Sequence, residues 1–481
     1  QMCIRVSRGT YLEADLEGDN VGGVIGFVGE GSKTYSGLSA SISVEGTRKV
    51  GGVIGYLSAD VSAEGLSYTG SVSTNATGEY LLENASRIMV GGLVGEYAAN
   101  TSLKNSAVTD STVTGASAAC TGALVGGTRN VNNVLIQSGN TQTNVTVVIR
   151  AEIADGFCLV AEGYEISNAN GLRYFGKSVN AGTQYQNATV LLAADIDLAG
   201  ENWTPMNMPA GVAPAVIDGQ NHTIRNMTVE GDEIGNRNCG FIGSTTATME
   251  IRNLIFENAS LANTGSFAGV VIGYQYGNIT LNSVDVINSS VKGRTTTDTV
   301  KDIRLGGLIG FSILNDGAKL TLKDCSVTGS EFYGYHNVGG LVGTLYDCWG
   351  DVNESYGSNG AYVPKDAWSM TGCSVTDCTF TIDGPNKNYV NAFAVDSAYV
   401  KTFDEATAAF AALSNTQTGN IFVYTRNILV VAANTYEIQN KAGFEEFRDA
   451  VNAGTSYQGK TVLLACDIDP VSYTHLTLPT T

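Results

Sequence analysis

The sequence predicts an all-β chain folded as a parallel β-helix, a solenoid in which short strands of successive coils stack on one another. Three observations support this prediction: a glycine-rich motif that returns about every 30 residues, runs of alternating apolar and polar residues, and a composition with 58 glycines but only 15% charged residues. A repeat of this length is typical of solenoids, because each repeat buries its apolar face against its neighbours.

The glycine-rich motif combines glycines with branched apolar residues, as in VGGVIG at 21–26. Four copies start at residues 21, 50, 90 and 121, and four more start at 239, 269, 305 and 338. Glycine inside a strand marks a tight bend or a close approach of two backbones. We therefore expect the glycines of successive copies to stack above one another. The apolar residues that follow them should form an interior column.

A second type of run follows the motif copies, as at 102–115, 278–293 and 319–334. Apolar residues tend to fall at every second position in these runs, for example Leu320 and Leu322. A period of two predicts a strand with one buried face. Small polar residues and glycine close each run, as turns require.

A longer repeat divides the chain into modules, because residues 164–197 match residues 436–469 at 21 of 34 positions. We predict the end of a first β-helix module plus a linker at 1–163 and a complete module at 164–435. The start of a third module follows at 436–469. Residues 470–481 depart from the repeat and are interpreted as a non-native tail.

Each long repeat contains a helix candidate, in which apolar residues spaced by three and four lie on one helical face. Gly182 and Gly454 follow the two candidates as plausible C-cap residues. We expect this short helix to cover the open end of a coil, since an exposed strand edge invites aggregation. The apolar residues are Leu172, Phe175 and Val179 in the first copy and Phe444, Phe447 and Val451 in the second.

The composition limits the classes of partner that this chain can bind. The net charge of −19 argues against nucleic acid, because Lys and Arg supply the main term in phosphate-backbone binding. No apolar run reaches the roughly 18 residues of a membrane helix, so we expect no direct membrane insertion by this chain.

Nine cysteines are an odd number and do not form a disulfide framework. We expect buried thiols, with a Cys373–Cys378 bond as the alternative.

Catalytic motifs are mostly missing from the sequence, and we predict a protein that is not an enzyme. Residues 454–461, GTSYQGKT, fit the phosphate-loop pattern, but a phosphate loop must follow a strand and open a helix. Here the expected order is helix, loop, strand. The three histidines, His222, His336 and His475, do not form a zinc-peptidase motif. We therefore expect no cofactor, with Ca²⁺ as the one ion to consider.

Two sets of residues remain as candidate ligand contacts. Asp195 and Asp197 lie two apart on a strand and could bind Ca²⁺ weakly, although Asp at a strand end more often caps a turn. The stretch 331–368 breaks the regular period and is rich in Tyr and Gly, and irregular loops often carry binding surfaces. Its preferred sugar-stacking residues are Tyr346, Trp349, Tyr356 and Trp368.

The glycine-rich units, together with the lead-in at 180–206 and 216–229, resemble the GLUG repeat of bacterial surface proteins. The resemblance covers nearly all of 1–469. It implies right-handed β-helix modules at the bacterial cell surface or outside the cell. It also implies a stalk or an adhesin, with host or dietary glycans or surface proteins as partners. Some members carry an immunoglobulin-A-type peptidase elsewhere, and the family offers no catalytic residues to carry over.

Two alternatives stay open. The first is a polysaccharide lyase or glycoside hydrolase built on a β-helix. The second is the non-catalytic region of a larger surface peptidase.

Overall fold

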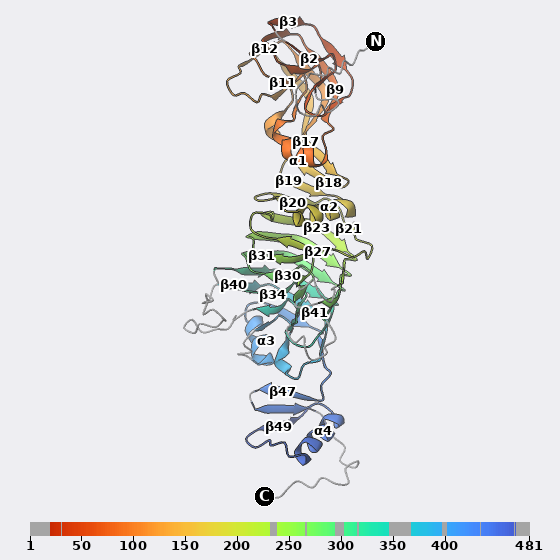
Figure 1. The fold of residues 1–481 in the computed structure, drawn as a ribbon, viewed down its shortest axis with the longest axis vertical. Coiled ribbons are helices and arrows are strands. Elements are labelled where there is room, and N and C mark those ends of the chain that lie inside the picture. The colour runs from red at the N-terminus through yellow and green to blue at the C-terminus, as the bar shows by residue number, and fades with distance from the viewer. Residues whose placement is uncertain are drawn as a thin grey trace. The chain divides into compact units, whose positions relative to one another are not determined.

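A computed structural model describes residues 20–29, 31–230, 238–264, 267–293, 303–314, 317–345, 367–396, 402–432, 434–465 and 467. The chain divides into two compact units, an N-terminal unit of residues 1–174 and a C-terminal unit of residues 175–481 (Figure 1). The strands of each repeat pair in parallel with those of the next repeat, and the set of strands from one repeat is called a rung below. The prediction of an all-β chain is confirmed in both units.

Parallel sheets run through the N-terminal unit, and each rung adds a strand to each of them. The first sheet contains β1 (Asn20–Gly22), β6 (Lys49–Gly51), β10 (Met89–Gly91) and β14 (Thr121–Gly122). The second contains β2 (Ile25–Val28), β7 (Ile54–Leu57), β11 (Val94–Tyr97) and β15 (Val125–Gly127). The third contains β3 (Lys33–Ser36), β8 (Val61–Glu64), β12 (Thr101–Lys104) and β16 (Leu135–Ser138). The fourth contains β4 (Ser39–Ser41), β5 (Val44–Gly46), β9 (Ser67–Thr74), β13 (Ala107–Gly115) and β17 (Thr141–Ala154).

The C-terminal unit repeats this plan. One sheet contains β25 (Asn238–Cys239), β29 (Phe267–Gly269), β33 (Arg304–Gly306), β38 (Val338–Gly339) and β43 (Val390–Asn391). A second contains β22 (Met206–Met208), β26 (Ile242–Thr245), β30 (Ile272–Gln275), β34 (Ile309–Ser312), β39 (Val342–Leu345) and β44 (Ala394–Asp396).

Two further sheets of the C-terminal unit carry the polar side chains discussed below. One contains β24 (Thr228–Glu230), β28 (Ser260–Thr264), β32 (Ser290–Gly293), β37 (Glu331–Gly334), β42 (Thr379–Ile382) and β46 (Ile421–Tyr424). The other contains β20 (Thr189–Leu192), β21 (Ile196–Asp197), β23 (Val216–Arg225), β27 (Met249–Glu257), β31 (Ile279–Ile287), β35 (Leu320–Lys323), β36 (Ser326–Thr328), β40 (Trp368–Thr371), β41 (Ser374–Thr376) and β45 (Thr416–Thr418).

Antiparallel strands occur where the long repeat begins. Strand β17 pairs with β18 (Phe157–Val160), which pairs with β19 (Gly163–Ile166). In the second copy, β47 (Ile428–Ala432) pairs with β48 (Thr435–Ile438), which lies parallel to β49 (Thr461–Leu464). The two copies of the long repeat therefore open with similar hairpins.

The motif glycines stack in register, as the sequence predicts. Gly51 pairs with Gly22 on one side and Gly91 on the other. A Cβ atom at Gly51 would lie 1.9 Å from the Ile54 carbonyl oxygen, so a side chain there would collide with the backbone. The residues after the glycines form the expected interior column, since Val53 and Leu93 are fully buried. Glycine therefore lets the chain turn tightly between the first two sheets.

Two rungs were not predicted from the sequence, because their motif strands contain no glycine. Strand β22 lies at one edge of the stack of motif strands, and β43 with β44 lies at the other. Asn391 pairs with Gly339, in a position that glycine occupies in earlier rungs. The Asn391 side chain donates to the Thr407 hydroxyl at 3.0 Å and accepts from the Phe393 amide at 2.9 Å. Asparagine can stand here because it hydrogen-bonds to neighbouring groups at the turn.

Both predicted helices are present, as α2 (Ala169–Asn180) and α4 (Lys441–Asn452). The apolar face of α2 is buried, and Gly182 has a positive φ of 88° after it. The Asn180 side chain donates to the Pro205 carbonyl at 3.2 Å and accepts from the Asn207 amide at 2.8 Å. The end of α2 therefore covers β22, the edge strand of its sheet, as the capping prediction expects.

Further helices were not predicted from the sequence. They are α1 (Gly78–Asn84) and α3 (Phe403–Ala411), with short 3-10 turns at Ala85–Arg87, Ala118–Cys120 and Lys387–Tyr389. Thr402 and Glu405 form a capping box at the start of α3. Helix α3 buries Phe410 against Phe393 of the last motif rung, with ring centroids 5.7 Å apart. A capping helix thus also closes the distal end of this stack.

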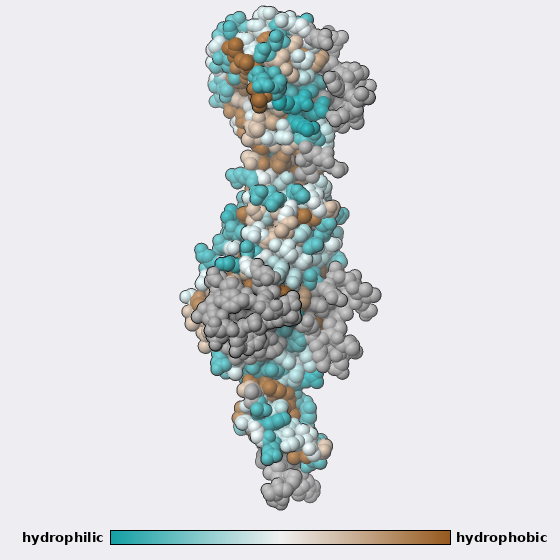
Figure 2. Space-filling view, turned by 60° about the vertical axis from the view of Figure 1, so that its left-hand side comes forward, coloured by the Kyte–Doolittle hydropathy of each residue, from teal (hydrophilic) through white to brown (hydrophobic). Residues whose placement is uncertain are grey.

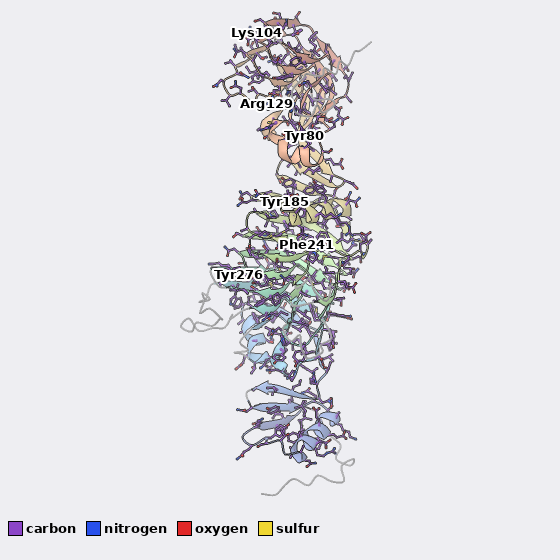
Figure 3. The ribbon with its side chains drawn as sticks, in the orientation of Figure 1. Tyr80, Lys104, Arg129, Tyr185, Phe241 and Tyr276 are labelled. Carbon is purple, nitrogen blue, oxygen red and sulfur yellow. The ribbon has the colours of Figure 1, made fainter. Side chains whose placement is uncertain are left out.

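The core of each unit is apolar, with aromatic side chains at the start of the C-terminal unit. Tyr185 and Phe241, labelled in Figure 3, are both 1% exposed. Trp203 stacks on Phe241 with ring centroids 5.4 Å apart, and its indole nitrogen donates to the Phe241 carbonyl at 2.9 Å. The Tyr185 ring meets Phe175 of α2 edge-on at 5.1 Å. Buried Trp and Tyr are well tolerated here because their polar groups have partners.

The described cysteines confirm the expectation of buried thiols. Cys120, Cys158, Cys239, Cys325, Cys373 and Cys378 are all free and buried. The alternative Cys373–Cys378 bond is not formed. The backbone amides of these two residues instead bind asparagine side chains of the next rung. The Cys373 amide donates to Asn415 and the Cys378 amide donates to Asn420, both at 2.9 Å.

Candidate functional site

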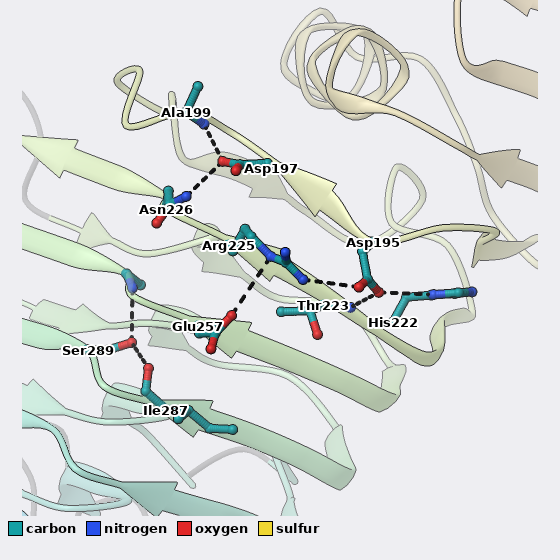
Figure 4. A network of polar contacts seen from close by, with 11 residues as sticks. Asp195, Asp197, Ala199, His222, Thr223, Arg225, Asn226, Glu257, Ile287 and Ser289 are labelled. Atoms are coloured by element: carbon teal, nitrogen blue, oxygen red, sulfur yellow. Dashed lines mark hydrogen bonds and ion pairs between the residues drawn. The ribbon is translucent and has the colours of Figure 1, made fainter.

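A polar network joins the first rungs of the C-terminal unit, and it contains the predicted carboxylates Asp195 and Asp197 (Figure 4). Asp195 precedes the short strand β21 and is exposed. Its Oδ1 accepts the Thr223 amide at 3.1 Å and lies 3.1 Å from Nδ1 of His222. Its Oδ2 accepts from Nη2 of Arg225 at 3.0 Å. Both oxygens of Asp195 therefore face nitrogen atoms of strand β23.

The charge state of Asp195 follows from these contacts. The Thr223 backbone amide, followed by the His222 side chain and the charge of Arg225, lowers the pKa of Asp195. A carboxyl group with a lowered pKa is ionised at neutral pH and holds no proton to give. It is also a weaker base than an ordinary carboxylate, because its neighbours already stabilise the negative charge.

Asp197 closes the turn after β21. Its Oδ1 accepts the Ala199 amide at 2.7 Å and the side-chain amide of Asn226 at 2.8 Å. The Asn226 side chain and then the Ala199 amide lower the pKa of Asp197. This arrangement is the turn cap that the sequence offered as the alternative to calcium binding.

The network supplies hydrogen-bond donors to both carboxylates, whereas Ca²⁺ requires six to eight oxygen ligands. Within the described ranges, His, Cys, Asp and Glu side chains do not gather in groups of three or more that could hold a metal. The geometry of Asp195 and Asp197 thus favours a role in joining β21 to β23.

Arg225 extends the network to the next rung. Its Nη2 binds Asp195, and its Nε lies 3.8 Å from Oε2 of Glu257 on strand β27. Asp195 lies directly before β21, Arg225 ends β23, and Glu257 ends β27, the next strand in the sheet. They form a ladder of alternating charge across the outer surface of the sheet, which ties neighbouring rungs together.

A second polar cluster lies at the bend of strand β23 and centres on Asp218. The Asp218 carboxylate accepts Nε of Arg252 at 2.8 Å, the side-chain amide of Asn253 at 3.1 Å and the Gln220 amide at 2.9 Å. Burial opposes ionisation of Asp218, but the bonds from Gln220, Arg252 and Asn253 outweigh it and lower the pKa. Asp218 lies where the pairing of β23 with β27 shifts register. Its partners 34 and 35 residues later could have been found from the repeat length.

The predicted aromatic contacts are placed only in part. Tyr346, Trp349 and Tyr356 lie outside the described residues. Trp368 begins strand β40, pairs with Leu320 and packs its ring against Phe410 of α3, with centroids 5.7 Å apart. Trp368 is half-buried, so part of its surface contributes to packing between a rung and a capping helix.

The phosphate-loop pattern has the reversed order that the sequence indicates. Helix α4 ends at Asn452, and β49 starts at Thr461 after the loop. The loop therefore does not present the amides of a helix N-terminus to a phosphate group. In the described part of the chain, none of the helices is long and apolar enough to cross a membrane.

Comparison with known proteins gives partial likenesses. No protein family matches the chain. A stretch of 174 residues, 35% of the chain, is 28% identical to halomucin from Haloquadratum walsbyi, and this stretch spans about 2% of halomucin's length. A solved structure of a candidate immunoglobulin A1 protease from Bacteroides ovatus aligns with 56% of this chain and 79% of its own, at 16% identity and a TM-score of 0.32.

Proposed function

We propose that this chain is a non-catalytic repeat module at the cell surface, folded as right-handed β-helices and acting as a stalk or an adhesin for glycans. One observation carries the proposal: the motif glycines stack in register across successive rungs, as Gly269, Gly306 and Gly339 do in the C-terminal unit. In-register rungs are suited to a spacer, since each rung pairs with the next along the stack.

The GLUG-like repeats and the partial likeness to halomucin support a place at the cell surface or outside the cell. The net charge of −19 fits a solvated surface and disfavours phosphate-backbone partners. Glycans or proteins on another surface are therefore the partners that we propose.

A polysaccharide lyase or glycoside hydrolase is the second candidate, because the rungs bring a carboxylate, an imidazole and a guanidinium together at Asp195, His222 and Arg225. Three features weigh against it. Asp195 has a lowered pKa, its oxygens already face nitrogen donors, and Arg225 is shared with Glu257. A glycosidase needs one carboxyl group with a raised pKa to act as the acid. The further idea of a non-catalytic region in a larger surface peptidase is compatible with the stalk.

A turnover assay tests the proposal. The full chain is incubated with host and plant polysaccharides, with and without Ca²⁺, while new reducing ends and unsaturated products are followed. We expect no turnover, and we expect Asp195→Asn to behave like the unchanged chain in this assay. Reproducible cleavage that disappears in Asp195→Asn would reject the proposal in favour of a lyase or hydrolase.

A further inference from the structure

A shallow groove of about 520 Å³ lies on the outer face of the sheet β3–β8–β12–β16 in the N-terminal unit. Its floor is crossed by one residue from each rung, because Thr34, Ser62, Ser102 and Ile136 are register partners on neighbouring strands. The loops before these strands add Asp60, Asn100 and Val134 to one side. The groove therefore runs across the strands, from rung to rung.

The hydroxyl groups in this groove differ from those on the neighbouring sheet. Across the β4–β9–β13 sheet, outer hydroxyls bond to each other, as Ser67 does to Ser39 at 2.8 Å and Thr69 to Thr109 at 3.0 Å. In the groove, the side chains of Ser62 and Ser102 make no hydrogen bond to any described residue. These hydroxyls are left to solvent or to a ligand.

The remaining lining is balanced in charge and has an apolar end. Lys33 and Asp60 contribute one positive and one negative group. The Asn100 amide donates to Oδ1 of Asp60 at 3.0 Å, which fixes that side of the groove. Val134 and Ile136 are 52% and 56% exposed at the fourth rung. Figure 2 shows brown, apolar surface among the teal surface of the N-terminal unit.

The backbone groups beneath the groove already pair with neighbouring strands. Strand β8 pairs with both β3 and β12, and β12 pairs with both β8 and β16. A peptide that binds by adding a strand needs a free sheet edge, which the centre of the groove does not provide. Recognition at the centre must therefore come from side chains.

We propose that this groove binds an extended, neutral oligosaccharide whose chain runs across the rungs. Neighbouring parallel strands are about 4.8 Å apart, so the rungs offer hydroxyl groups at a regular spacing to the hydroxyls of successive sugar rings. Val134 and Ile136 provide an apolar surface for the C–H face of a ring, and the nearly balanced charge suits a ligand without net charge. The inference rests on the adhesin form of the proposed function.

The experiment measures retardation of the full chain in native gels that contain arabinoxylan, mixed-linkage β-glucan, galactomannan or desialylated mucin. We expect one of these neutral glycans to retard the chain. The double variant Ser62→Ala/Ser102→Ala should bind that glycan at least tenfold more weakly, and Ile136→Asp should do the same. The matched control Ser39→Ala/Ser67→Ala removes hydroxyls from the neighbouring sheet and should bind like the unchanged chain.

The possible outcomes distinguish a failure of the groove proposal from a failure of the proposed function. If no glycan in the panel retards the chain, the groove proposal is wrong while a stalk without a ligand survives. If glycan binding persists in both groove variants, the adhesin survives and its site lies elsewhere. Thermal unfolding of each variant shows whether a loss of binding comes from a loss of folding, and Lys33→Ala, which keeps the hydroxyls, should retain most of the affinity.

Discussion

Gly52 lies so close to the ring of Tyr68 that a Cβ atom at residue 52 would approach the ring carbons to 2.6 Å. Tyr68 is 1% exposed, and its hydroxyl donates to the carbonyl oxygens of Ile42 and Ser71. The second glycine of this motif copy therefore makes room for a side chain from another sheet of the N-terminal unit. The pair explains why the motif needs two adjacent glycines at this turn.

The first prediction concerns Gly52→Ala. The added methyl group would have to push aside a buried ring and the Gly92 carbonyl oxygen, which is 2.1 Å from the ideal Cβ position. We expect the free energy of unfolding to fall by about 1–3 kcal/mol, the usual cost of overpacking. Denaturant titration measures it. Gly29→Ala is the matched control, because its Cβ would meet an ordinary contact at 3.4 Å from Phe27. Equal stability of the two variants would contradict the packing argument.

The second prediction concerns Asp218→Asn. The substitution keeps the shape of the side chain but removes the charge that faces Arg252. We expect a loss of about 1–2 kcal/mol at pH 7, since hydrogen bonds to charged groups are worth more than neutral ones. Chemical unfolding at pH 7 measures the loss. A variant as stable as the unchanged chain would mean that the ion pair is fully screened by solvent.

Acid should reduce the stability contributed by Asp195, Asp197 and Asp218, whose pKa values are all lowered in the folded chain. For a lowered pKa, the contribution is fully present above the unfolded value near 3.9 and is lost as the pH falls through the folded value. The stability difference between the unchanged chain and Asp218→Asn should therefore shrink below about pH 4. A difference that stays constant from pH 7 to pH 2 would argue against this linkage.

The fourth prediction concerns Asn415, which is 3% exposed in the last rung of the C-terminal unit. Its side chain accepts from the Cys373 amide and donates to the carbonyls of Met370 and Phe410, all at 2.9 Å. Asn415→Ala leaves the buried Cys373 amide without its partner and removes a donor from the Met370 and Phe410 carbonyls, so we expect a loss of about 1–3 kcal/mol. Urea titration measures it, with the exposed Asn132→Ala as a control that should change little. Similar behaviour of both variants would refute the role of Asn415.

The fifth prediction concerns calcium. Because hydrogen-bond donors face Asp195 and Asp197, millimolar Ca²⁺ or a chelator should shift the melting temperature of the full chain by less than about 1 °C. Calorimetry in the two conditions measures this shift. A clear rise of the melting temperature with Ca²⁺ that is absent in Asp197→Asn would instead establish a calcium site at this turn.

The regular part of the fold was predictable because its signals are local. The double glycines, the alternating apolar runs and the three apolar residues of each predicted helix all reflect backbone geometry within a few residues. The rung at 390–396 was missed because Asn391 replaces glycine by bonding to α3, a contact that depends on the tertiary structure. Helix α3 was missed because its apolar face is short and becomes evident mainly from its packing on Phe393.

The polar sites were harder to predict. Asp195 and Asp197 were recognised as a pair, but their side-chain partners come from strand β23 and from Asn226, which follows it on the next rung. Arg252 and Asn253 reach Asp218 from one repeat away, and their role appears only when the repeats are laid in register. The groove at Ser62 and Ser102 carries no sequence motif. It is recognised from the register of four strands and from hydroxyls that are paired on the adjacent sheet but not in the groove.

Deletion of one whole rung tests the stacking account most directly. Gly269 and Gly306 are register partners, so a chain in which residues 270–306 are removed joins Gly269 to Gly307 in the same phase. If each rung is stabilised mainly by pairing with its neighbours, the shortened chain should keep its β-type circular dichroism and a cooperative thermal transition at a slightly lower temperature. The account would be contradicted if the shortened chain were unfolded or aggregated while the Gly29→Ala control, prepared in the same way, folded normally.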